Sequence, residues 1–93
     1  MRKASFRFDF KIVATKSFEK SRKKEFKKFP KIAKKLKKSL KSLKNDPFQG
    51  KRIQSFGERR IWVGKTHRLF YDIEGSDIVL LQLKKKDKGT YRN

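Results

Sequence analysis

The spacing of hydrophobic residues changes twice along this chain, and each change predicts a different kind of secondary structure. Over residues 5–13, hydrophobic and polar residues alternate, which predicts a half-buried strand. Its hydrophobic positions are Phe6, Phe8, Phe10 and Ile12. From about Thr15 the spacing becomes three or four residues, which predicts an amphipathic helix capped by Thr15 or Ser17. The row that faces the core in this helix is Phe18, Arg22, Phe26 and Phe29.

A second amphipathic helix follows Pro30, which cannot continue the first helix but is well placed to open the next one. Its apolar row is Ile32, Leu36, Leu40 and Leu43. The segment Asn45-Asp46-Pro47 ends this helix, because the residue before a proline avoids the helical conformation. The two helices therefore form a hairpin, and a connecting loop begins at Phe48-Gln49-Gly50.

The last third of the chain returns to the spacing of strands. After a weak segment at Arg52-Ile53, three β-like runs cover residues 59–63, 67–73 and 78–84. Turn residues separate them, at Gly64-Lys65 and over Glu74–Asp77. Strands joined by such short turns are antiparallel neighbours, so this region is predicted to be a three-stranded meander.

These elements define an α+β fold. Ninety-three residues provide one domain, so residues 1–93 are predicted to form a single domain with the order β-α-α-β-β-β. We expect one small sheet that contains the N-terminal strand and the meander, with the helical hairpin packed on one face. No apolar run approaches the roughly 20 residues of a membrane span. The basic N-terminus lacks the apolar segment of a signal peptide, and the expected location is cytoplasmic.

Charge narrows the range of partners. The chain carries 29 Lys and Arg against 9 Asp and Glu, a formal net charge of +20. Such a charge suits nucleic acid, an anionic membrane surface or an acidic protein. Residues 16–44 alone hold fourteen basic residues and two glutamates. This excess fits either a solvated helix face or a surface that meets phosphates, although ordinary solvated helices mix both signs.

Alternation within the predicted strands separates the basic residues into two faces. In 67–73, His67 shares one face with Leu69 and Tyr71, whereas Arg68 lies on the other. The apolar face should pack on the helices and leave Arg68 on the open face. By the same alternation, Arg60 and Trp62 point outward beside Arg68. Lys84 and Lys85 end the last strand, so either could reach this surface, and Trp62 offers a ring on which a base could stack.

The remaining candidates are a histidine, a tyrosine and a few carboxylates. His67 is the only histidine, but alternation places it toward the core, where a structural role is expected. Tyr91 lies far enough beyond the last strand to fold back over the basic face. No Cys is present, and the carboxylates near 72–77 surround a turn, so no metal site and no cofactor are predicted.

The chain resembles the RelE/ParE superfamily of bacterial and archaeal toxins, which are small ribosome-dependent endoribonucleases and their relatives. The resemblance covers nearly the whole chain. It rests on the order of elements and on three segments, which read DPFQGKRI, RRIWVGKTHRLFYDI and DIVLLQLKKKDKGTY. It implies the α+β fold described above. It also implies a toxin that cleaves messenger RNA in the ribosomal A site, by attack of the 2′-hydroxyl and without metal.

The resemblance also suggests which residues act. By position, Arg68 corresponds to the central strand arginine of the ribonuclease members, and Arg60 to a basic position on the preceding strand. Lys85 corresponds to the basic residue that closes the last strand, and Tyr91 to the late tyrosine. These four are the predicted catalytic residues. The predicted RNA-binding residues are Trp62, Lys84, Lys86 and Arg59. Trp62 replaces a lysine found in some members, so the general base stays open, with Lys84 or Lys86 as substitutes.

Two other functions remain open at this stage. The same fold serves ParE-like inhibitors of DNA gyrase that have no nuclease activity, and a basic protein of this size could bind RNA without cutting it. A toxin of this superfamily implies an acidic antitoxin as partner, together with the ribosome and its message. The antitoxin is expected on the basic helical face or on the concave sheet.

Overall fold

The computed structural model describes residues 10–52 and 58–86. Its elements, in chain order, are β1 (Lys11–Ala14), α1 (Lys16–Lys28), α2 (Ile32–Asn45), the 3-10 helix η2 (Pro47–Gln49), β2 (Lys51–Arg52), β3 (Arg59–Val63), β4 (His67–Glu74) and β5 (Asp77–Lys85). The helical hairpin and the three later strands therefore occur where the sequence predicts them. The predicted first strand is present from Lys11, and its earlier part, with Phe6 and Phe8, lies outside the described residues.

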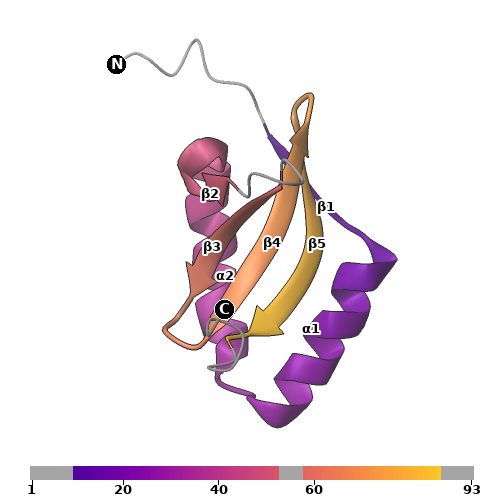
Figure 1. Ribbon diagram of the computed structural model, residues 1–93, viewed down its shortest axis with the longest axis vertical. Coiled ribbons are helices and arrows are strands. Elements are labelled where there is room, and N and C mark those ends of the chain that lie inside the picture. Colours follow the sequence, from indigo (N-terminus) through magenta and orange to yellow (C-terminus); the bar gives the residue numbers. More distant parts are fainter. Residues whose placement is uncertain (1–9, 53–57, 87–93) are drawn as a thin grey trace, which may run out of the picture.

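One five-stranded sheet contains all these strands, in the order β1-β5-β4-β3-β2 (Figure 1). β3, β4 and β5 form the predicted antiparallel meander. β1 pairs in parallel with β5, because the helical hairpin carries the chain back across the sheet before the meander begins. β2 adds a two-residue edge, in which Lys51 lies opposite Arg60 and Arg52 opposite Arg59. The weak segment predicted near Arg52 is thus a short edge strand.

Local side-chain chemistry fixes the ends of the helices. Thr15 caps α1, since its Oγ1 accepts a hydrogen bond from the Phe18 N–H at 3.1 Å. The same hydroxyl donates to the Leu80 carbonyl at 2.8 Å and so joins the start of α1 to β5. Pro30 lies in the turn between the helices, and α2 ends at Asn45, one residue before Asp46. These boundaries agree with the sequence prediction.

Both helices cover the same face of the sheet, with α1 along β5 and α2 along β3 (Figure 1). Between them and the sheet lies the core, whose buried residues are Phe18, Ile32, Leu36, Leu43, Val63, Leu69, Tyr71, Ile78, Leu80 and Leu83. The predicted apolar rows of both helices face this core, although Phe26, Phe29 and Leu40 are only partly buried. Arg22 lies at the margin, where it pairs with Glu19 and rests over the Phe26 ring. No helix in the described part of the chain is long and apolar enough to cross a membrane.

A bulge in the middle of the sheet changes which side chains of β5 face the helices. Tyr71 lies opposite Leu80, but Phe70 lies opposite Gln82, so Leu81 is an extra residue in β5. One extra residue moves every later side chain to the other face of the strand. Before the bulge, Ile78 and Leu80 face the core. After it, the core residue is Leu83.

Candidate nucleic-acid interface

Strand register places basic residues from four strands in two rows across the open face of the sheet. In the first row, Lys51 of β2 lies opposite Arg60, Arg60 opposite Phe70, and Phe70 opposite Gln82. In the second row, Trp62 lies opposite Arg68 and Arg68 opposite Lys84. Residues directly opposite each other on neighbouring strands share a face and lie side by side. The predicted grouping of Arg60, Trp62 and Arg68 is therefore confirmed.

The alternate positions of the same strands face the helices, and two predicted site residues lie there. Val63, His67 and Lys85 form one row on this face, and Arg59 and Tyr71 are neighbours in another. Lys85 points its ammonium over the Phe29 ring, with the nitrogen 5.3 Å from the ring centroid. The structure therefore does not bring Lys85 together with Arg68. The bulge at Leu81 is the reason, because it turns Lys84 toward the open face and Lys85 toward the helices.

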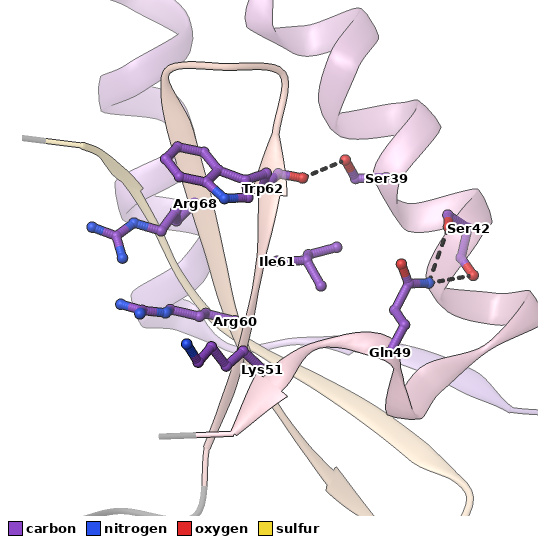
Figure 2. Close-up of a pocket in the computed structure, with 8 residues that line it drawn as sticks. All are labelled: Ser39, Ser42, Gln49, Lys51, Arg60, Ile61, Trp62 and Arg68. Atoms are coloured by element: carbon purple, nitrogen blue, oxygen red, sulfur yellow. Dashed lines mark hydrogen bonds between the residues drawn. The ribbon is translucent and has the colours of Figure 1, made fainter. Parts of the chain in front are cut away.

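A pocket of about 550 Å³ opens at the β3 side of the open face (Figure 2). Lys51, Arg60 and Arg68 extend along one side of β3, and the Trp62 indole lies above the Arg68 side chain in this view. The other lining residues are Ser39, Ser42, Gln49 and Ile61. No carboxylate is among the described residues that line the pocket. A space with three cations, one aromatic ring and no negative charge suits an anion that carries a flat group.

Arg68 is more buried than its position on the open face suggests. Only 8% of the residue is exposed, because the Trp62 ring packs against it with the guanidinium carbon 5.4 Å from the ring centroid. Burial, and secondarily the positive charge of Arg60, lowers the pKa of the Arg68 guanidinium from its ordinary value. The group stays charged at neutral pH, and an anion between the two arginines would offset both effects. Alternation predicted the side correctly but not this degree of burial.

Trp62 keeps ring surface available despite its contact with Arg68. It is 48% exposed, which is unusual for so large an apolar side chain. Lys86 also contacts the ring, with its Nζ 5.4 Å from the centroid. Trp62 therefore gathers two cations around one aromatic ring, and its remaining exposed surface is open to a further flat partner. Lys84, in the same row as Trp62 and Arg68, is exposed.

Arg59 holds the connector to the sheet and does not point into the pocket. Its Nη1 donates to the Phe48 carbonyl at 3.2 Å and to the Gly50 carbonyl at 3.0 Å, and its guanidinium lies over the Phe48 ring. The structure therefore does not bring Arg59 together with Arg60 and Trp62, and its predicted role in RNA binding stays a prediction. The reason is alternation, since Arg59 and Arg60 are neighbours in β3 and must face opposite sides.

Tyr71 fixes the same connector from inside the core. Its hydroxyl donates to the Pro47 carbonyl at 2.7 Å and accepts the Gly50 N–H at 3.0 Å. Gly50 leaves no room for a larger residue, because a Cβ there would overlap the Tyr71 hydroxyl and ring. Burial is the main cause that raises the pKa of Tyr71 above its ordinary value. Together, Tyr71 and Arg59 set the path of the chain that presents Gln49 and Lys51 to the pocket.

His67 occupies the structural position that the sequence predicts. The residue is fully buried, and its Nε2 lies 3.0 Å from Glu25 Oε1 of α1. Its Nδ1 lies 2.8 Å from the Thr66 hydroxyl, and its ring meets Phe29 edge to face. These contacts join α1 to the start of β4 on the helix side of the sheet. Sequence spacing gave no sign that Glu25 would be the buried partner.

Other site residues lie outside the described part of the chain or were not predicted. Tyr91 lies outside the described residues, so its predicted role stays a prediction. The sequence did not predict four residues that line the pocket, which are Lys51, Ser39, Ser42 and Gln49. A two-residue strand has too few positions to show alternation, so only pairing with β3 could reveal Lys51. Among the described residues, no three His, Cys, Asp or Glu side chains are grouped as a metal site would require.

Comparison with known proteins finds a matching family and several solved structures with a similar fold. Residues 12–88 match the family model described as the ParE toxin of the type II toxin–antitoxin system, parDE. A search of curated proteins finds no match. Among solved structures, a YoeB/ParE toxin from Agrobacterium tumefaciens is 17% identical with a TM-score of 0.70, covering 84% of this chain and 100% of that chain. The toxin–antitoxin complex RelBE2 from Mycobacterium tuberculosis is 21% identical with a TM-score of 0.68, covering 85% and 100%.

A third similar structure, the YoeB–YefM complex from Staphylococcus aureus, is 24% identical with a TM-score of 0.63, covering 84% of this chain and 98% of that chain. At these identities the structural likeness establishes the fold alone. The family model spans most of the sequence, and the chain therefore belongs to the ParE toxin family, within the RelE/ParE superfamily. It is a toxin of a type II toxin–antitoxin system.

Proposed function

We propose that this toxin is an endoribonuclease that cuts messenger RNA in the ribosomal A site. The observation that carries the proposal is the pocket on the open face, where Arg60, Arg68 and Lys51 lie beside Trp62 with no carboxylate in the described lining. A phosphodiester would accept hydrogen bonds from both guanidinium groups, and a base beside it would meet the exposed indole. The rest of the basic surface would hold ribosomal RNA phosphates through salt-sensitive contacts.

The reaction needs charge stabilisation and two proton transfers. The 2′-oxygen forms a bond to the adjacent phosphorus as its proton passes to a base, and the bond from phosphorus to the 5′-oxygen breaks as that oxygen takes up a proton. The products are a 2′,3′-cyclic phosphate and a 5′-hydroxyl. Arg68 and Arg60 would stabilise the extra negative charge on the phosphorus-bound oxygens through charge-assisted hydrogen bonds.

The lysines of the open face are the described candidates for proton transfer. Lys51 lies opposite Arg60 and Lys84 opposite Arg68, so each flanks an arginine that would hold the phosphate. The proposal assigns proton transfer to these two in preference to Lys85, whose ammonium rests on Phe29 at the helix side. Tyr91 remains a further candidate on the strength of the family resemblance.

The test is to incubate purified protein with ribosomes that carry a defined message and to map the new 5′ ends. The proposal expects cuts inside the A-site codon, with 5′-hydroxyl ends. A message with a single 2′-deoxy nucleotide at the cut position should resist cleavage there, because the attacking hydroxyl is absent. Cleavage of the 2′-deoxy message at an unchanged rate would refute the 2′-hydroxyl mechanism, and intact message in both cases would refute nuclease activity.

A second candidate function is inhibition of DNA gyrase without cleavage of RNA. The description of the matching family as ParE toxins favours it. Inhibition of gyrase supercoiling by the same preparation, together with intact message on ribosomes, would support this alternative. RNA binding without either effect would support a non-catalytic binding protein.

We also propose that the antitoxin is an acidic chain that docks on α2. A groove of about 710 Å³ runs along this helix, with Ile12 and Leu40 as its apolar residues. Its rim consists of Lys34, Lys35, Lys37, Lys38, Lys41 and Lys44. No acidic residue lies in α2, and the two glutamates of α1 are engaged by Arg22 and His67. An amphipathic segment with an apolar stripe and flanking carboxylates fits this groove.

Co-expression with a candidate antitoxin tests this docking site. The double substitution Lys37→Glu and Lys41→Glu reverses two charges on the rim and should weaken the complex at least about tenfold, given the cost of like charges in an interface. The matched control is Lys23→Glu with Lys24→Glu on α1, which makes the same charge change outside the groove. Equal affinity of both double variants would place the antitoxin elsewhere.

A further inference from the structure

The pocket has a second wall, on the other side of β3, that carries no charge. β2 pairs only with Arg59 and Arg60, so among the described residues no strand lies along the outer edge of β3 beyond that point. The pocket passes around this open edge to α2 and the connector, where Ser39, Ser42 and Gln49 line it together with Ile61 (Figure 2). The cationic wall suits phosphate, whereas an uncharged wall with one apolar side chain suits a neutral group.

Gln49 presents a fixed acceptor on this wall. Its Nε2 donates at 3.0 Å to the Ser42 carbonyl and at 3.1 Å to the Asp46 carbonyl, and it also lies 3.0 Å from the Ser42 hydroxyl. Because two of these partners are carbonyls, which only accept, the orientation of the amide is determined. Its Oε1 makes no hydrogen bond with any described residue and, in Figure 2, points away from Ser42 toward the space beside Ile61.

The neighbouring groups on this wall are also constrained. Ser39 donates its hydroxyl to the Trp62 carbonyl at 3.2 Å and so closes the α2 side of the pocket. The Ser42 hydroxyl accepts a hydrogen bond from the Gln49 amide and can still donate one of its own. An acceptor and a donor therefore lie next to each other above an apolar floor. The Tyr71 contacts with Pro47 and Gly50 hold the connector in place on either side of Gln49.

We propose that this uncharged wall is a nucleobase subsite. In it, the Gln49 Oε1 would accept a hydrogen bond from an amino or imino group of a base whose phosphate lies on the cationic wall. Ile61 would contact the face of that base, and the Ser42 hydroxyl would meet a ring nitrogen or carbonyl next to the donor. A pocket of this volume falls within the roughly 300–1,000 Å³ usual for small ligands, so one nucleotide fits. The inference deepens the proposed function, on which it rests for the identity of the ligand.

Binding of short RNA that cannot be cut tests the subsite directly. The probes are 2′-O-methyl trinucleotides with adenine, cytosine, guanine, uracil or no base at the middle position. The wild-type protein should bind at least one of the four bases about tenfold more tightly than the abasic probe, the effect of one well-placed hydrogen bond with its apolar contact. The side-chain amide signals of Gln49 should shift in the NMR spectrum with that base and not with the abasic probe.

Substitution assigns the effect to the amide. Gln49→Ala should bring the affinity of the preferred probe to within about twofold of the abasic probe. Asn45→Ala is the matched control, because Asn45 is an exposed amide at the end of α2 outside the pocket, and it should leave the preference intact. Thermal melting checks that both variants are folded. Equal binding of all five probes by wild-type protein, or an unchanged preference in Gln49→Ala, overturns the inference.

The results separate this inference from the proposed function. Base discrimination through Gln49 without cleavage of ribosome-bound message keeps the subsite and rejects the nuclease. Cleavage with no discrimination among the five probes keeps the nuclease and rejects the subsite. Absence of any binding to the probes rejects the subsite as well.

Discussion

The two faces of the sheet use neighbouring residues of similar chemistry for opposite purposes. Arg59 and Arg60 are adjacent, yet Arg59 holds the connector through two carbonyls while Arg60 lines the pocket. Lys84 lies in the open row with Arg68, whereas Lys85 rests on Phe29. Position along a strand, more than residue type, therefore decides which cations lie on the helix side and which lie on the open face.

Among the pairs of neighbouring residues, Arg59 and Arg60 of β3 should show the largest difference in the effect of substitution. Arg60→Ala should lower the rate of message cleavage about a hundredfold, the effect of losing one preorganised charged donor, with little change in stability. Arg59→Ala should instead lower the free energy of unfolding by about 1 kcal/mol, because it loses its hydrogen bonds to Phe48 and Gly50. Cleavage kinetics and urea unfolding of both variants make the comparison. Similar rates in the two variants would remove the distinction between the faces.

The two glutamates of α1, Glu19 and Glu25, should contribute differently to stability on the helix side. Glu25→Ala should lower the free energy of unfolding by about 2 kcal/mol, because it leaves the buried His67 ring without its carboxylate partner. Glu19→Ala, in the same helix, removes only a partly exposed pair with Arg22 and should change stability by no more than about 0.5 kcal/mol. Urea unfolding measures both. Cleavage per folded molecule should be the same in the two variants, and a selective loss in Glu25→Ala would bring His67 into the mechanism.

The stabilising effect of the buried Tyr71 hydroxyl should depend on pH. Tyr71→Phe should lower the free energy of unfolding by about 1 kcal/mol near pH 8, through the lost contacts with Pro47 and Gly50. The pKa of this phenol is raised in the fold from its ordinary value of 10.0, so above that pH the unfolded chain ionises first and the wild type loses stability. The gap between wild type and Tyr71→Phe should therefore narrow above about pH 10. A gap that widens there would contradict a neutral, buried Tyr71.

The adjacent lysines of β5 give the smallest effect. Lys84→Ala should reduce the slope of the logarithm of RNA affinity against the logarithm of salt concentration by about 0.7, the value for one phosphate contact on single-stranded RNA. Lys85→Ala should leave that slope unchanged, because its ammonium lies on the helix side. Binding titrations at several salt concentrations provide the slopes. A larger change in Lys85→Ala would mean that this side chain also reaches RNA.

Local signals in the sequence were sufficient for most of the fold and for part of the site. Thr15, Pro30 and Asp46 determine where the helices begin and end through short-range chemistry, and the sequence reveals such effects. Alternation likewise placed Arg60, Trp62 and Arg68 on one face and His67 on the other.

The remaining features depend on contacts between segments that are distant in the sequence. Simple alternation from Ile78 would place Lys84 toward the helices, and only the extra residue Leu81 reverses this. Lys51 and Gln49 enter the pocket through the pairing of β2 and the Tyr71 contacts, which no local pattern shows. The burial of Arg68 depends on how Trp62 packs across the strand pair.

The most direct test of the open-face site is the single-turnover cleavage of ribosome-bound message by Arg68→Ala. If Arg68 stabilises the transition state, the rate should be about 10²–10³ lower than that of the wild type, the usual effect of removing a principal electrostatic stabiliser. Because Arg68 is largely buried, thermal melting must show that the variant is folded under the assay conditions. A folded Arg68→Ala protein that cuts the message at the wild-type rate would show that the open face is not the catalytic site.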